Sequence, residues 1–549
     1  MAKCQYKGCS NEAYDSESSL CILHCKKTLE FKDKDEFESA LNQYVESDER
    51  IVRTKASPGN ISGYKKFTIT GVDFPWDGNV RTLVNIQKDI SYDYVNFVDC
   101  TIRVGRITNV IAKGAGIPEP YIYFEKCSFS YDAIDDEKFL ELRLFNYQAD
   151  KREEKYRYHM SFFDSTFCSD LNLIVYDNSP KSRRDTGYTQ DFLFKKCHFL
   201  GSLKVDTKGN SVESHVDFFK SCRFGGSGKA KLTVRNLHFL GESLHDCSFE
   251  KIDLDIKDSY FKERVSLNGG RFSSIFFKGL KFAGKFEIKY GSDKYNLPPP
   301  FCIKISNVDF LGVSDFNGAP INELEFRRVD FRGFFAFEDV GVIDKGCQGL
   351  FEYVTFHNHA TFRGAKFLGG LNLDRANFSG EANFLGVDAD GGNIANTTRE
   401  TYRLIKHSFD KIGNHLEANK FFAKEMDKYR EEVSGNKSLP LWDRAVFHIN
   451  KNVSDFGQNY LLSIGWLLLS MVFYFYTFVL HRHFGLIHPK PSCDVFGNWY
   501  DKVNCLASGM IPFNSFLTSG MELLSLLFYM IFAVLVWQTV VALKRHIRR

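Results

Sequence analysis

The stretches FEKCSF (residues 124–129), FKKCHF (194–199) and FKSCRF (219–224) share one pattern. An apolar residue is followed three positions later by a small residue, and a phenylalanine comes two positions after that. Degenerate copies continue from residue 69 to residue 378, most of them roughly 21 to 28 residues apart, and this period is typical of the coils of a solenoid. With 54 phenylalanines among its 549 residues, the chain can build a large aromatic interior.

The spacing excludes a helical repeat, because residues three and five positions apart do not share one face of a helix. It fits a β-helix of square section, in which each side is about five residues long and residues i and i+5 both point inward on successive sides. The residue two positions before the second aromatic must be small, because it points inward where the chain turns. We therefore predict a mainly β fold, a quadrilateral β-helix whose phenylalanines stack coil upon coil.

Cysteine fills the small position in five copies of the pattern, and there it acts as a small apolar side chain. Ala376 and Val329 take the same place in other copies, which a metal-ligand role would not allow. We expect these thiols to be buried, with no redox role: Cys100, Cys127, Cys197, Cys222 and Cys247.

The stretch ATFRGAKFLGGLNLDRANFSGEANF (residues 360–384) resembles pentapeptide-repeat proteins, whose consensus is A-(D/N)-L/F-x-x. The resemblance implies a right-handed quadrilateral β-helix that acts as a binding scaffold without catalysis. Some members mimic DNA, but 71 basic and 68 acidic residues argue against that role and against a nucleic-acid partner. RETYRLIKHSFDKIGNHLEANKFFAKEM (399–426) resembles the segment that follows the repeats in bacterial membrane-anchored members, and its periodicity predicts a helical hairpin broken at Gly413 and Asn414.

The N-terminal stretch CQYKGCSNEAYDSESSLCILHC contains two close pairs of potential metal ligands. This spacing resembles small zinc knuckles of the treble-clef type, and we expect a structural zinc ion bound by Cys4, Cys9, Cys21 and His24. The adjacent Cys25 is the alternative to His24, and a set of free thiols is the alternative to a metal site. Because both pairs would be occupied, no position would stay open for catalysis.

Two uncharged apolar segments near the C-terminus, Tyr460 to Leu480 and Leu523 to Leu543, are long enough to cross a hydrocarbon core of about 30 Å. Basic residues gather before the first segment and in the terminal KRHIRR. The positive-inside rule then places both termini in the cytoplasm. We therefore predict a protein that crosses a membrane twice, and the resemblance to bacterial membrane-anchored members implies that this is the bacterial cytoplasmic membrane.

The loop between the two segments would lie in the oxidising periplasm. There we expect Cys493 and Cys505 to form a disulfide, with two free thiols as the alternative. Glu522 is a possible pore residue, although the loop carries no carbonyl-filter motif. A carboxylate at a helix start is the simpler interpretation.

These patterns divide the chain into a zinc-knuckle-like module (1–30), a helical linker (31–60), the β-helix (61–390), a helical hairpin connector (397–435) and a two-span membrane domain (440–549). We find no phosphate-binding loop, nucleophile elbow, HExxH motif or dinucleotide fingerprint, and we expect no enzyme activity. The leading prediction is a membrane-anchored scaffold, tethered and oligomerised by its spans, whose cytosolic β-helix binds a protein partner. The alternative is an oligomeric ion channel or membrane-permeabilising effector, for example in anti-phage defence, gated by the cytosolic domain.

Overall fold

The computed structural model divides the chain into two compact units, Met1–Gly392 and Asn393–Arg549, and each is described by itself. It describes residues 3–7, 9, 11–14, 19–27, 31–47, 66–75, 94–103, 105–108, 121–131, 139–145, 147–148, 156–176, 190–208, 211–226, 228–290, 299–392, 396–435, 441–457, 459–484, 499, 517–518 and 521–547.

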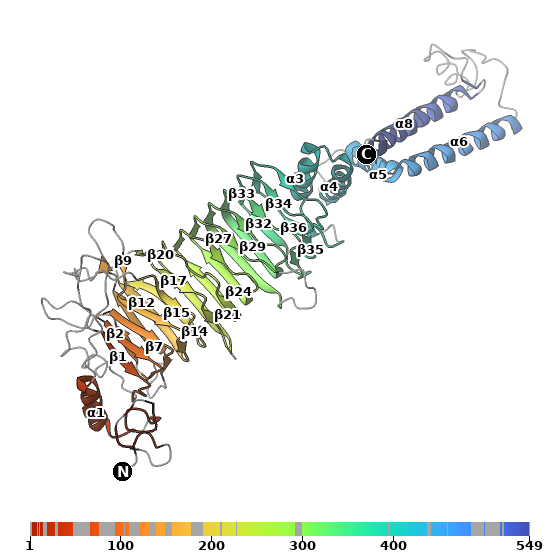
Figure 1. Cartoon of the computed structure of the whole chain (residues 1–549). Helices are drawn as coiled ribbons and strands as arrows, with labels where there is room; N and C mark the ends of the chain where they lie inside the picture. The colour runs from red at the N-terminus through yellow and green to blue at the C-terminus, as the bar shows by residue number, and fades with distance from the viewer. Residues whose placement is uncertain are drawn as a thin grey trace. The chain divides into compact units, whose positions relative to one another are not determined.

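The first unit is a β-solenoid built of parallel strands, as the repeat predicts (Figure 1). One sheet contains, in order, β1 (Lys66–Thr70), β2 (Tyr94–Val98), β5 (Tyr121–Glu125), β10 (Met160–Phe163), β13 (Phe192–Lys195) and β17 (Asp217–Lys220). A second contains β23 (Val265–Ser266), β26 (Phe286–Glu287), β28 (Ser314–Asp315), β30 (Phe335–Ala336), β34 (Ala360–Thr361) and β38 (Ala382–Asn383).

The largest sheet runs along the solenoid and turns its corners. Its strands are β3 (Thr101–Arg103), β4 (Arg106–Thr108), β6 (Ser128–Ser130), β7 (Phe139–Phe145), β11 (Thr166–Phe167), β12 (Asp170–Tyr176), β14 (His198–Phe199), β15 (Leu203–Lys208), β16 (Val212–Ser214), β18 (Arg223–Phe224), β19 (Ala230–Arg235), β20 (Leu237–Phe239), β21 (Ser248–Lys257), β22 (Tyr260–Phe261), β24 (Arg271–Lys278), β25 (Lys281–Phe282), β27 (Phe301–Phe310), β29 (Pro320–Phe331), β31 (Gly341–Val342), β32 (Gly349–Glu352), β33 (Thr355–Phe356), β35 (Lys366–Phe367), β36 (Leu371–Asn372) and β37 (Asn377–Phe378). The insertion after β7 forms a small antiparallel pair, β8 (Tyr147–Gln148) and β9 (Tyr156–Arg157).

One coil in the C-terminal half consists of the four short strands β32, β33, β34 and β35. The next strand, β36, lies back on β32, with Leu371 opposite Gly349. Four strands per coil agree with the predicted four-sided section. Most strands pair without a register shift with the equivalent strand one coil later, so equivalent positions of successive coils stack, although the pairings β21–β24 and β27–β29 contain local shifts.

The hexapeptide pattern places its two aromatic residues on neighbouring sides of one corner. Phe124 on β5 and Phe129 on β6 are both buried, and their rings meet edge to face at 5.2 Å. Cys127 lies between them, fully buried, and its thiol donates to the carbonyl oxygen of Phe97 in the preceding coil at 3.4 Å. The small residue therefore fills the corner, as predicted.

The aromatic residues stack coil upon coil, as the repeat predicts, and they form several columns. In the first column, successive ring centroids are 4.9 to 5.5 Å apart through Phe97, Phe124, Phe162, Phe194 and Phe219. A second column joins Phe129, Phe167, Phe199, Phe224 and Phe249 at 4.8 to 5.3 Å. A third, on another corner, joins Phe239, Phe261, Phe282, Phe310, Phe331, Phe356 and Phe378 at 4.7 to 5.3 Å. Along the chain, the stacked phenylalanines thus move from one corner of the solenoid to another. The hexapeptide pattern fits any corner, so the sequence does not reveal this move.

The second unit is helical. It contains α3 (Arg399–Lys411), α4 (His415–Gly435), α5 (Leu441–Ser454), α6 (Tyr460–His483) and α8 (Glu522–Ile547). The side chain of Thr398 caps α3 by accepting from Thr401 N, and Gly413, with φ of 77°, separates α3 from α4. Arg399 at the start of α3 pairs with Glu432 near the end of α4, so the two helices form the predicted antiparallel hairpin.

Candidate metal centre and membrane hairpin

Two tight turns carry the four ligand-type residues of the N-terminal module. Cys4 and Cys9 lie in a loop closed by an antiparallel bridge between Lys3 and Glu12. In the second turn, the amide of His24 donates to the carbonyl oxygen of Cys21 at 3.0 Å. This turn brings residues three positions apart to the same side, which explains the Cys-x2-His spacing.

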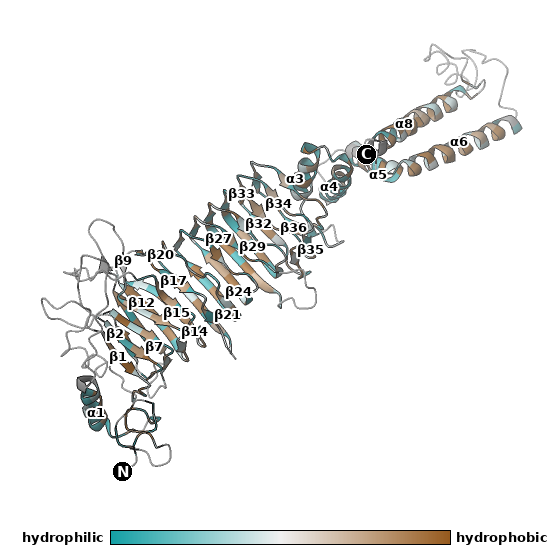
Figure 2. Ribbon diagram, viewed as in Figure 1, coloured by the Kyte–Doolittle hydropathy of each residue, from teal (hydrophilic) through white to brown (hydrophobic). Residues whose placement is uncertain are grey.

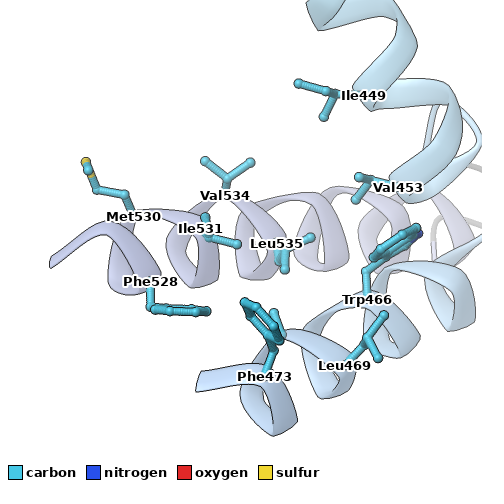
Figure 3. Close-up of a pocket in the computed structure, with 11 residues that line it drawn as sticks. Ile449, Val453, Trp466, Leu469, Phe473, Phe528, Met530, Ile531, Val534 and Leu535 are labelled. Carbon is cyan, nitrogen blue, oxygen red and sulfur yellow. The ribbon is translucent and has the colours of Figure 1, made fainter. Parts of the chain in front are cut away.

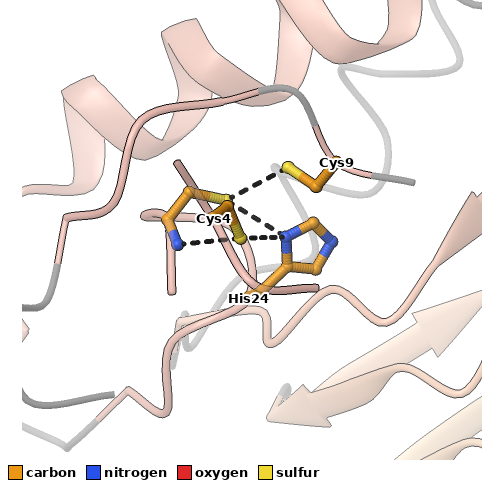
Figure 4. A group of neighbouring side chains, drawn as sticks. Cys4, Cys9 and His24 are labelled. Atoms are coloured by element: carbon orange, nitrogen blue, oxygen red, sulfur yellow. Dashed lines mark hydrogen bonds between the residues drawn. The ribbon is translucent and has the colours of Figure 1, made fainter. Parts of the chain in front are cut away.

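The side chains of Cys4, Cys9, Cys21 and His24 converge, with all four potential ligand atoms within 4.8 Å of one another (Figure 4). The two sulfur atoms of Cys9 and Cys21 are 3.7 Å apart, and Nδ1 of His24 is 3.7 Å from the Cys4 sulfur and 3.1 Å from the Cys21 sulfur. A tetrahedral zinc ion, with bonds of about 2.3 Å to sulfur and about 2.0 Å to nitrogen, holds two sulfur ligands about 3.8 Å apart and sulfur and nitrogen about 3.5 Å apart. The four side chains therefore fit such an ion.

The protonation chemistry of the cluster also suits a metal ion. Burial lowers the pKa of His24, so its imidazole is neutral near pH 7, the form that binds metals. Burial raises the pKa of the Cys9 thiol to about 12, so this group gives up its proton only to a strong competitor such as zinc. The amide of Cys21 donates to the Cys4 sulfur at 3.2 Å, a contact that stabilises a thiolate.

The second nitrogen of His24 determines which tautomer can bind the metal. Nε2 lies 3.3 Å from the carbonyl oxygen of Thr70 on β1, and a carbonyl can only accept. Nε2 therefore carries the proton, and Nδ1 keeps its lone pair directed at the thiols. The ring of Tyr6 stacks on the imidazole with centroids 4.0 Å apart and nearly parallel planes.

Cys25, the alternative fourth ligand, lies outside the cluster. Its side chain is buried, and its sulfur points toward the carbonyl oxygen of Ile22 at 3.8 Å. The structure thus places His24, rather than Cys25, with the thiols of Cys4, Cys9 and Cys21.

Two helices of the second unit are long and apolar enough to cross a membrane. The candidate spans are Tyr460–His481 within α6 and Glu522–Lys544 within α8, which include the predicted segments from Tyr460 to Leu480 and from Leu523 to Leu543. Apolar residues predominate along both helices (Figure 2). Most of these side chains are uncovered in the isolated unit; Phe475, for example, is 66% exposed. A buried pair of core helices would not expose such side chains, so the two helices suit a hydrocarbon solvent.

Three hydrogen bonds between side chains join the helices to each other and to α5. On α8, Gln538 Nε2 donates to Asn450 Oδ1 at 2.8 Å, and Ser454 Oγ donates to Gln538 Oε1 at 3.1 Å. Toward the other end of the pair, the Tyr474 hydroxyl on α6 lies 3.2 Å from Ser525 Oγ. In an apolar solvent such bonds have no competition from water, so they orient the helices.

α5 is amphipathic and precedes the first span. Trp442, Val446 and Ile449 form an exposed apolar stripe at helical spacing, with Trp442 82% exposed. Lys451 belongs to the polar side and pairs with Asp427 of α4 at 3.0 Å and with Asp455 at 2.7 Å. A helix of this composition suits the membrane–water boundary.

An apolar groove of about 720 Å³ lies between α5, α6 and α8 (Figure 3). Its wall includes Val453 from α5, Trp466 and Phe473 from α6, and Ile531 and Val534 from α8. Trp466 is held in place because its Nε1 donates to the carbonyl oxygen of Asn452 at 2.9 Å. The groove offers only hydrocarbon-like surface, as expected for a site that faces lipid tails.

The remaining predicted residues are placed only in part. Cys493, Cys505 and most of the loop before Glu522 lie outside the described residues. Glu522 is the first residue of α8 and is buried. Its position at a helix N-terminus agrees with the simpler interpretation of this carboxylate.

Sequence reasoning missed two groups that organise these sites. The Thr70 carbonyl is a backbone atom and carries no side-chain signal. Gln538 is the one strongly polar residue of an otherwise apolar segment, a signal that indicates a polar partner but does not identify Asn450 and Ser454.

No protein-family model matches the chain, and neither the curated proteins nor the solved structures include a match. The geometry of the chain itself therefore carries the functional argument.

Proposed function

We propose that the protein is a non-enzymatic, membrane-anchored scaffold. A β-solenoid offers a long outer surface of stacked strands to a protein partner, and α6 and α8 tether it to the membrane. The observation that carries the proposal is the combination, in one chain, of a solenoid with two long helices whose apolar side chains are mostly exposed. Such surfaces are stable in lipid and not in water.

Three finer points belong to the same proposal. The membrane is the bacterial cytoplasmic membrane, in keeping with the resemblance to bacterial pentapeptide-repeat proteins. Both termini face the cytoplasm, in keeping with the distribution of basic residues. The four-ligand cluster holds a structural zinc ion, which would supply folding free energy to a module too small for a core of its own.

The tether is tested by fractionation and topology mapping. The full chain should stay in the membrane pellet after extraction at alkaline pH and enter solution only with detergent. A tag at either terminus should be protected from protease in intact spheroplasts and cleaved in inverted vesicles. Recovery of the chain in the soluble fraction would refute the anchor.

The partner and the oligomeric state are tested in the same membranes. Photo-crosslinkers placed on exposed strand positions, such as Lys278 of β24 and Lys231 of β19, should capture one recurrent protein, whereas a crosslinker on the buried Phe162 should capture none. Native mass spectrometry of the detergent-solubilised chain should give a homo-oligomer. A strictly monomeric chain without any crosslinked partner contradicts the scaffold.

The second candidate is an oligomeric channel or membrane-permeabilising effector. Glu522 favours this candidate. It is a buried carboxyl residue at the N-terminus of α8, and ionisable groups within membrane segments often mark ion pathways. Planar-bilayer recording separates the candidates. Unitary currents that change in Glu522→Gln would replace the scaffold with the channel, and a silent bilayer at the same protein density excludes the channel.

A further inference from the structure

The N-terminal module lies against the first coil of the solenoid, and the metal cluster lies at the contact. Besides the 3.3 Å contact between His24 Nε2 and the Thr70 carbonyl, the amide of Asp73 donates to the carbonyl oxygen of Leu23 at 2.9 Å. Leu23 is the residue directly before the ligand His24. The turn that carries two of the four ligands therefore forms hydrogen bonds to both sides of the corner that follows β1.

Tyr6 fills the space between the cluster and this corner. Its ring stacks on His24, and its hydroxyl end reaches the α-carbon of Gly71, where an added β-carbon would come within 2.0 Å of the ring. Gly71 has φ of 68°, a conformation that favours glycine. The close approach of the Tyr6 ring leaves no room for a β-carbon at Gly71, so the corner is shaped to receive the module.

Helix α1 (Lys34–Ser47) closes the end of the aromatic interior. Phe37 packs edge-on against Phe74 with ring centroids 6.0 Å apart, and Phe74 in turn contacts Phe97 of the first aromatic column at 6.1 Å. Phe37 and Phe74 are both fully buried. Lys27, between the cluster and α1, donates to the carbonyl oxygens of Leu23 and Cys25 at 3.0 Å and lies over the Phe37 ring at 4.9 Å.

We propose that the metal ion is a lock that fastens this N-terminal cap onto the first coil of the solenoid, with His24 as the bridging residue. The bound zinc ion fixes the Nδ1 face of the imidazole, and the Nε2–H then donates to Thr70. Solenoids need such caps because an uncovered terminal coil exposes apolar side chains and unpaired strand edges. A module of this size has too few apolar residues to fold alone, so metal binding supplies its folding free energy.

The proposal goes beyond membrane anchoring and rests on contacts within the first unit alone. It assigns the zinc a conformational role: the availability of the metal decides whether the first coil is covered. The side chain of Cys9 would bind only the metal ion, whereas the side chain of His24 would bind the metal ion and also contacts Thr70 of the first coil. The two residues can therefore be separated by substitution.

The test is hydrogen exchange by mass spectrometry on the full chain in detergent, together with zinc content from inductively coupled plasma mass spectrometry. The reporter is the peptide around Asp73, whose amide bonds to the cap. The internal reference is the amide of Ser128, which bonds to Cys100 within the solenoid. The wild-type chain should hold one zinc ion and exchange slowly at both places.

Chelation, or the variant Cys9→Ser, should remove the zinc and speed exchange around Asp73 at least tenfold, with Ser128 unchanged. Re-addition of zinc to the chelated wild-type chain should restore protection, which distinguishes a released cap from a misfolded chain. His24→Cys should keep zinc on four thiolates and still exchange faster around Asp73, because the donor to Thr70 is gone. Cys25→Ser, a neighbouring cysteine outside the cluster, should match the wild type in both measurements.

The lock is refuted if the wild-type chain binds no metal, or if chelation leaves exchange around Asp73 unchanged. Wild-type protection in His24→Cys would refute the bridging role of His24. Loss of protection at Ser128 in the chelated chain would also count against it, because the effect would then spread beyond the cap. None of these results bears on membrane anchoring, which the fractionation experiment tests separately.

Discussion

Several corners of the solenoid combine one residue in the left-handed backbone region with one small residue directly after it. Lys126, Asp164 and Tyr353 have φ between 49° and 54° and precede Cys127, Ser165 and Val354. The small position was predictable, because the interior leaves room for few side chains there. The left-handed position was not. Asp often takes this conformation, but Lys126 and Tyr353 carry no such signal and hold it at a cost of about 1–2 kcal/mol.

Cys197 tests the small corner position. Cys197→Ala should lower the free energy of unfolding by less than about 1.5 kcal/mol, whereas Cys197→Leu should overpack the corner and lower it by about 1–3 kcal/mol or more. Thermal unfolding followed by circular dichroism measures both. Equal stability of the Ala and Leu variants would mean that the corner is not closely packed.

The same residue tests thiol reactivity. Burial raises the pKa of Cys197 well above its usual value, whereas Cys168 is exposed at the surface. Iodoacetamide should therefore modify Cys168 in the folded protein and reach Cys197 only after unfolding. Peptide mass spectrometry reads both sites, and rapid labelling of Cys197 in the folded chain would revive a redox role for the corner thiols.

Glu287 of β26 gives the solenoid a pH dependence. Burial alone raises its pKa, but hydrogen bonds from Lys285 and Arg264 outweigh burial and hold the pKa at about 2, below the ordinary 4.5. The charged form is thus favoured in the folded state, and its stabilisation is complete above pH 4.5 and is lost as the pH falls toward 2. The contribution is about 2 kcal/mol, less than the full pKa difference implies, because the two cations are partly exposed to solvent.

Glu287→Gln should remove this contribution. The variant should unfold at a lower temperature than the wild type at pH 7, and the difference should shrink steadily between pH 4.5 and pH 2. Glu352, a partly exposed surface residue of β32 paired with Arg327, provides the matched control as Glu352→Gln. A constant difference across this pH range would show that Glu287 acts through packing rather than charge.

At the scale of the element, the aromatic columns join one coil to the next. Phe162 stacks on Phe124 and on Phe194 at 5.0 Å each and is fully buried. The strand period and the inward side were readable from sequence, because a strand alternates and the hexapeptide repeats. The sequence did not show that the columns lie on different corners, since every corner accepts the same residues.

Phe162→Ala should cost about 3–5 kcal/mol and lower the thermal midpoint by roughly 5 °C. Phe139→Ala on β7 is the control, because this phenylalanine lies on the outer surface. Its midpoint should stay within about one degree of the wild type. If both variants unfold alike, the columns do not determine the stability of the solenoid.

The positions of the helices in the second unit can be predicted from composition, but the hydrogen bonds that join them cannot. Hydropathy located α6 and α8, whereas the bond from Gln538 to Asn450 spans 88 residues of sequence. No local pattern reports a pair so far apart. The same reason hid the contact between His24 and Thr70, although the spacing of the ligands themselves was readable.

Gln538→Leu should release α5 from α8 without dissolving either helix. The loss of two hydrogen bonds in an apolar solvent is worth about 1–2 kcal/mol, so amides of α5 should exchange roughly five to thirty times faster. Thr539→Val is the control, because Thr539 bonds only within its own helix, to Leu535. Unchanged exchange in α5 would assign its position to packing alone.

At the scale of the whole molecule, the solenoid is modular along its axis. Each coil pairs only with the coil before it and the coil after it. For example, Gly349 of β32 lies opposite Leu371 of β36 in the next coil. Duplication or deletion of one complete turn of chain would therefore change the neighbours of the adjacent coils alone and leave the pairing of all other coils as it was. Since stacked strands are about 4.8 Å apart, the reach of such a protein changes in fixed increments. Duplication of single coils within the gene could thus change the length of the solenoid stepwise, while the metal-binding module and the apolar helices stay unchanged.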